Sequence, residues 1–90
     1  MANPSIKQLT AYVWTKVATN VTAGIVHKIS NSPNKYLQTY RMTGGTEPTG
    51  KTEGVPLFVD GPSENISATS GIDVYIMPVG SDGKVRIDLP

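Results

Sequence analysis

The chain has 90 residues, no cysteine and a formal net charge of +1 at pH 7, with eight basic and seven acidic residues spread along it. This balance creates no surface field that would steer a polyanion, so a nucleic-acid partner is not expected. No apolar stretch approaches the roughly 18 residues that a membrane span requires, so a membrane partner is not expected either.

The N-terminal residues Met1-Ala2-Asn3-Pro4-Ser5 lack the basic and apolar regions of a secretory leader. We therefore expect synthesis in a cytoplasm without secretion. Residues 1–7 are predicted to form an extended arm, and residues 8–90 to form a single domain, because no linker, repeat or low-complexity block divides them.

Seven segments alternate apolar and polar residues with the period of a β-strand. In chain order they are residues 9–17, 24–30, 35–42, 55–59, 66–68, 72–77 and 84–89. Residues 18–24 and 69–71 break this alternation and are predicted to reverse the chain. Pro56 has no N–H to donate, which places it at a sheet edge or at the first residue of a strand. The last two segments flank Ser81-Asp82-Gly83, a favoured turn sequence, and are predicted to pair as a hairpin.

These elements predict an all-β fold: a compact antiparallel β-sandwich or small barrel of six to seven short strands, with no substantial helix. Residues 31–34 and 60–65 are expected to be turns. Residues 43–54 contain four Gly and one Pro, and we expect them to form a long exposed loop.

Residues Gly45–Thr52 match the phosphate-binding pattern G-x-x-x-x-G-K-[ST]. That loop binds phosphate because it leads into the N-terminus of a helix. Here Gly54 and Pro56 follow and then an apolar, β-branched run, so a strand is expected instead of a helix. The match is therefore interpreted as a coincidence, with no nucleotide or other cofactor.

Groups able to support catalysis are few, since the chain has no Cys and one His. His27 lies between Val26 and Lys28 and is expected to be a surface or half-buried strand residue. Asp73 and Asp88 fall on polar strand faces and could approach each other, although carboxylates in such places usually serve solubility. The loop acids lack the dense spacing of a calcium site: Asp60, Glu64 and Asp82. We therefore expect no enzyme, no catalytic residues and no metal site.

Aromatic residues suggest a binding surface. Tyr12 and Trp14 are predicted to share one strand face, as are Tyr36 and Tyr40, with Arg41 adjacent. Aromatic residues and Arg are common anchors of protein interfaces, so these five residues form the candidate interface. Two alternatives remain open: the same rings could fill the core, or they could form a platform on which sugars stack.

The order of several segments resembles the small all-β virion proteins of tailed bacteriophages. The segments are Trp14–Ala18, Tyr40–Pro48, Gly54–Val59, Ile66–Ser67, Asp73–Ile76 and Gly83–Ile87. The similarity covers most of the chain and is one of layout, so it assigns no functional residue.

This resemblance implies a non-enzymatic structural protein located in the virion, most simply a capsid decoration or cement protein that stabilises the shell through subunit contacts. It implies no cofactor, and as partners the major capsid protein or neighbouring structural subunits, with homo-oligomers such as a trimer. The alternative is a carbohydrate- or receptor-binding β-module of a tail or head fibre. The arm and the loop at residues 43–54 could lie across neighbouring subunits.

Overall fold

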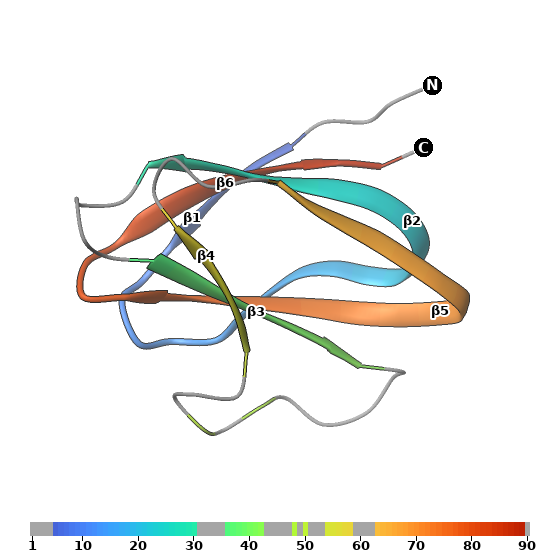
Figure 1. Cartoon of the computed structure of the whole chain (residues 1–90), viewed down its shortest axis with the longest axis horizontal. Coiled ribbons are helices and arrows are strands. Elements are labelled where there is room, and N and C mark those ends of the chain that lie inside the picture. Colours follow the sequence, from blue (N-terminus) through green and yellow to red (C-terminus); the bar gives the residue numbers. More distant parts are fainter. Residues whose placement is uncertain are drawn as a thin grey trace.

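A computed structural model describes residues 5–30, 36–42, 48, 50, 54–58 and 63–89. In these residues there is no helix, and the strands form one antiparallel sheet in the order β1-β6-β2-β5-β3-β4 (Figure 1). The strands are β1 (Ser5–Leu9), β2 (Thr15–Ser30), β3 (Tyr36–Met42), β4 (Val55–Phe58), β5 (Glu64–Val79) and β6 (Gly83–Asp88). The prediction of an all-β, antiparallel fold is confirmed.

The sheet folds over on itself because β2 and β5 bend together. Each has 16 residues, and their pairing shifts register between Lys16 and Ala23. Before the bend, β2 pairs only with the second half of β5; beyond it, β2 pairs with both the first half of β5 and β6. Figure 1 shows the result as two layers, one with β1 and β6, the other with β3 and β4. The expectation that all strands would be short is therefore wrong.

Residues near the bend adopt backbone geometry that suits a sharp change of direction. Asn20 has φ 54°, a left-handed conformation that Asn tolerates better than most residues, and its N–H donates to Asp73 Oδ1 at 3.0 Å. Gly24 has φ 155°, and a Cβ there would lie 2.9 Å from the carbonyl oxygen of Asp88. At Gly71 a Cβ would collide with the side chain of Asn20. The predictions of turns at 18–24 and 69–71 are therefore wrong, since the chain changes direction there through bulged bends within strands.

The main core lies between the two layers and draws on both. Its buried members are Leu9, Val17, Ala18, Val26, Leu37, Ile66, Ile72, Val74, Ile76, Val85 and Ile87. In regular stretches such as Val74–Ile76 and Val85–Ile87 these side chains point inward because alternate residues of a strand face opposite sides, whereas the adjacent Val17 and Ala18 lie at a register shift. The radius of gyration of 12.0 Å confirms the expected compactness.

A second, smaller cluster covers the other face of β5. Trp14, Tyr75 and Met77 are buried there, with Val79 packed against them. The indole Nε1–H of Trp14 donates to the carbonyl oxygen of Gly50 at 2.8 Å. Pro48 is also buried. The chain therefore buries Trp14 by itself, which favours the core interpretation of this residue.

The start of the chain differs from the prediction. Ser5–Leu9 pairs with β6, so residues 5–7 of the expected arm belong to the sheet. The predicted strand at 9–17 is interrupted by a turn in which Tyr12 has φ 61° and donates its N–H to the carbonyl oxygen of Pro78 at 2.8 Å. Thr15 begins β2. A residue with positive φ ends the alternation on which that prediction relied.

The predicted final hairpin is also wrong, because β6 pairs with β1 and β2 and not with β5. After Val79, Gly80 has φ 92°, and the chain crosses to the other layer (Figure 1). By contrast, of the two places predicted for Pro56, the sheet edge is confirmed, since β4 ends the sheet and Pro56 is the second residue of that strand. The strand predicted after the phosphate-loop match is confirmed as β4.

Several predictions lie outside the described residues. They are the turn at 31–34, most of the loop at 43–54 and the first part of the turn at 60–65.

Candidate functional site

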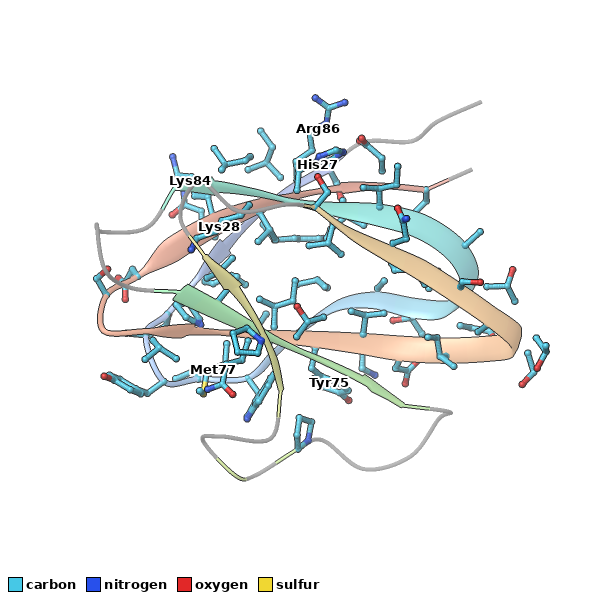
Figure 2. All side chains as sticks on the ribbon, viewed as in Figure 1. His27, Lys28, Tyr75, Met77, Lys84 and Arg86 are labelled. Atoms are coloured by element: carbon cyan, nitrogen blue, oxygen red, sulfur yellow. The ribbon has the colours of Figure 1, made fainter. Side chains whose placement is uncertain are left out.

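The most distinctive exposed surface is the side of the β1-β6-β2 layer that faces away from the core. We call it the outer face. It consists of Ile6 on β1, of Lys84, Arg86 and Asp88 on β6, and of Ile25, His27 and Ile29 on β2. The register places Ile6, Arg86 and His27 in one row across the three strands, and Ile25 beside Asp88 in the next. Figure 2 shows His27, Lys84 and Arg86 on this side.

Three isoleucines are left in contact with solvent on the outer face. Their exposed fractions are 63% for Ile6, 46% for Ile29 and 37% for Ile25. The intervening residues Val26 and Val85 are fully buried, because they point to the core. A single exposed apolar residue is ordinary, but several on one sheet face indicate a surface suited to a partner.

Polar side chains form a connected chain among these isoleucines. Asp88 Oδ1 accepts a hydrogen bond from Arg86 Nε at 2.9 Å, and Asp88 Oδ2 lies 3.0 Å from His27 Nε2. On the other ring nitrogen, His27 Nδ1 lies 2.7 Å from the hydroxyl oxygen of Ser63. Residues of β6, of β2 and just before β5 are thus held in one hydrogen-bonded arrangement.

The charges of this arrangement reinforce one another. The hydrogen bond from Arg86 lowers the pKa of Asp88 below its ordinary value, partly opposed by desolvation, while the charge of Arg86 and the neighbouring His27 ring lower it further. Conversely, the hydrogen bond and charge of Asp88 raise the pKa of Arg86. Asp88 is therefore an ionised acceptor at neutral pH, and Arg86 is anchored beside Ile6 on the outer face.

Of the five residues predicted as an interface, Tyr12 and Trp14 are not brought together on one surface. Trp14 is buried at 6% exposure, whereas Tyr12 is 47% exposed in the preceding turn. These two do not share a strand face, which corrects that prediction. Tyr36, Tyr40 and Arg41 lie in β3. Their register partners on β5 are Val79, Tyr75 and Val74, and their side chains fall outside the described part of the structure.

Asp73 and Asp88, which the sequence suggested could approach each other, are held apart. Asp73 Oδ2 lies 3.6 Å from Lys16 Nζ on one layer, and Asp88 contacts His27 and Arg86 on the other. The expectation that they could approach each other is wrong, because it assumed that β5 and β6 pair.

His27 is a partly buried strand residue, as predicted, with its side chain 39% exposed. Its contacts with Ser63 and Asp88 span 36 and 61 positions of sequence, so no local pattern could reveal them. Within the ranges that the structure describes, no three His, Cys, Asp or Glu side chains are grouped to hold a metal ion.

A shallow depression of about 200 Å³ lies at one end of the layer, next to β1 and β6. It is lined by Gln8, Leu9, Thr10, Asp82, Gly83 and Lys84. Asp82 Oδ1 accepts the N–H of Ala11 at 2.8 Å, so this carboxylate ties the turn after β1 to the turn before β6. We interpret the depression as part of that junction.

Comparison with known proteins finds no matching family model, no matching curated protein and no matching solved structure. The described residues contain no helix that is long and apolar enough to cross a membrane.

Proposed function

We propose that this protein is a non-enzymatic structural protein of a virion, most simply a capsid decoration or cement protein that binds through its outer face. The proposed binding surface rests on one observation: Ile6, Ile25 and Ile29 are exposed around Arg86, which Asp88 holds in place. Apolar side chains beside an anchored Arg are typical of interface centres. The assignment to a virion rests on the resemblance in segment order.

The folded sheet would act as a small sandwich-like unit that presents this face without rearrangement. A core that draws on both layers holds β1, β6 and β2 in fixed register. A preorganised face loses less conformational entropy on binding than a flexible one, which favours stable attachment to a shell. The proposed partners are the major capsid protein or neighbouring structural subunits.

Homo-oligomers, for example a closed trimer, are part of the proposal. In the part of the chain that the structure describes, β1 and β4 are the edges of the sheet, and edge strands present backbone groups that can pair in such contacts. The mass measured by light scattering distinguishes a trimer from a monomer.

The alternative is a carbohydrate- or receptor-binding module of a tail or head fibre. It is supported by Tyr12, whose side chain is 47% exposed next to the exposed Val13. Burial of Trp14 removes from this hypothesis the ring that would stack most strongly on a sugar. A glycan array tests it, and loss of glycan retention in a Tyr12→Ser variant would support it.

The decisive experiment measures binding to emptied capsids of tailed bacteriophages. Ile6→Ser and Ile25→Ser should each weaken binding by about tenfold or more, because truncating an interface anchor costs more than about 1 kcal/mol. Both positions are exposed, so the fold should be retained. Val13→Ser, at an exposed site away from the outer face, is the control and should bind like the native protein. The proposal fails if the native protein does not bind the capsids, or if it does not raise the melting temperature of the shell.

A further inference from the structure

The hydrogen-bonded chain of Ser63, His27 and Asp88 has the connectivity of an activated nucleophile. Such sites hold a hydroxyl within about 2.6–3.2 Å of a base, which a third group orients. Here Ser63 Oγ lies 2.7 Å from His27 Nδ1, and Asp88 Oδ2 lies 3.0 Å from His27 Nε2. Both distances fall in that range.

The tautomer of the His27 ring follows from its contact with Asp88, which is a hydrogen-bond acceptor. An ionised carboxylate can only accept, so the proton of neutral His27 resides on Nε2 and points to Asp88. This leaves the lone pair of Nδ1 to accept the hydroxyl proton of Ser63. The two ring nitrogens are used in the opposite order to the familiar serine protease arrangement, but either nitrogen of imidazole can act as the base.

The surroundings favour this state. The pKa of Asp88 lies below its ordinary value because Arg86 donates to its other oxygen, which keeps the carboxylate ionised and oriented. Ser63 is exposed, so a reagent in solution can reach its hydroxyl. The exposed Ile25, two residues from His27 on the same strand face, offers apolar contact to an acyl group.

We propose that Ser63 is a nucleophilic modification site that accepts an acyl group from an activated ester, with His27 as general base and Asp88 as the positioning residue. The oxygen of Ser63 bonds to the ester carbonyl carbon while its proton moves to His27 Nδ1. The bond between that carbon and the leaving alcohol or phenol then breaks, and the leaving group takes the proton from His27. The products are a serine ester and a free alcohol or phenol. One acyl group is transferred per chain, without requirement for turnover.

The test incubates the intact protein with p-nitrophenyl acetate, and separately with a fluorophosphonate probe, and locates adducts by peptide mass spectrometry. Ser63 should be labelled faster than Ser67, an exposed serine on β5 that serves as an internal control. His27→Gln should slow labelling of Ser63 by about a hundredfold, because general-base assistance typically contributes 10²–10⁴-fold. Asp88→Asn should slow it as well.

Two outcomes would overturn the proposal: Ser63 labelled no faster than Ser67, or labelling of Ser63 unchanged in folded His27→Gln protein. The comparison of Ser63 with Ser67 needs only native protein, so it holds even if a variant fails to fold. Shell binding by the outer face is measured separately and can succeed or fail independently of this result.

Discussion

Trp14 shows at the scale of one residue how context replaces sequence pattern. Its ring lies against Tyr75 and Met77, and its indole N–H reaches the carbonyl oxygen of Gly50 across 36 positions of sequence. An aromatic side chain of this size contributes much apolar burial, and its polar atom has found a partner. Trp14 is therefore a structural residue of the second cluster.

We expect Trp14→Phe to lower the free energy of unfolding by about 1–3 kcal/mol, because it removes the hydrogen bond from the indole N–H to the Gly50 carbonyl and reduces packing. Urea unfolding followed by far-ultraviolet circular dichroism measures the change. Val13→Ala, at the neighbouring exposed position, should alter it by less than about 0.5 kcal/mol. Equal effects of the two substitutions would contradict the burial of Trp14.

Asp88 makes a pH-dependent contribution whose sign follows from its lowered pKa. A carboxyl group with a lower pKa in the folded than in the unfolded state stabilises the fold above its ordinary pKa of 3.8, and this stability is lost as pH falls through the folded pKa. Arg86→Gln removes the main cause of the shift. The difference in unfolding free energy between native protein and this variant should therefore be present at neutral pH and disappear in strong acid.

Urea titrations across that pH range, together with the carboxyl carbon shift of Asp88 by NMR, measure this effect. Lys84→Gln removes the other β6 cation of the outer face and is the matched control, with no such pH-dependent difference expected. A difference for Arg86→Gln that grows in acid would have the wrong sign for our account.

At the scale of elements, the short strand β1 contributes residues to both the main core and the outer face. Leu9 is buried in the main core at 3% exposure, whereas Ile6 is 63% exposed on the outer face. Strand geometry places the two residues on opposite faces, but it does not decide which face is buried, since both residues are apolar. It arises because the core extends under the end of β1 and the opposite side of the layer is uncovered.

Leu9→Ala should therefore cost about 2–4 kcal/mol of unfolding free energy, through lost burial and the cavity left behind. Ile6→Ala should cost less than about 0.5 kcal/mol in the same thermal or urea measurement. If Ile6→Ala were the more damaging substitution, the assignment of the two faces of β1 would be inverted.

Strand pairing was the feature of the elements that local sequence predicted least well. Alternation correctly indicated strands around residues 24–30, 35–42 and 72–77. It also suggested a final hairpin, since consecutive strands often pair. The positive φ of Gly80 and the bend of β5 instead direct β6 to the other layer, beside β1 and β2. Such a choice depends on how whole layers bury their apolar faces, which no short segment encodes.

At the scale of the molecule, β5 links the two apolar clusters. Val74 and Ile76 point to the main core, while Tyr75 and Met77 point to the second cluster with Trp14. Neither cluster can lose its order without disturbing the strand that both share, so we expect the chain to unfold as one cooperative unit.

Fluorescence of Trp14, the single tryptophan, reports on the second cluster, and far-ultraviolet circular dichroism reports on the whole sheet. The two urea transitions should have the same midpoint and slope. Separate midpoints would show that the second cluster melts alone.

The candidate site was only partly accessible from sequence. Ile25, His27 and Ile29 could be placed on one strand face from their alternation, but not identified as the exposed one, because the opposite positions are partly apolar too. The contacts of His27 with Ser63 and Asp88 required the pairing of β2 with both β5 and β6.

By itself, the amino-acid order determined that this chain forms antiparallel strands, with a strand after the phosphate-loop match and with Pro56 at a sheet edge or a strand start, because side-chain period, Gly and Pro act over a few residues. Only the tertiary structure decided the order of the strands, the burial of Trp14 and the exposure of the three isoleucines. These features depend on contacts between residues far apart in the chain, which form only once the bent β2 and β5 bring the two layers face to face.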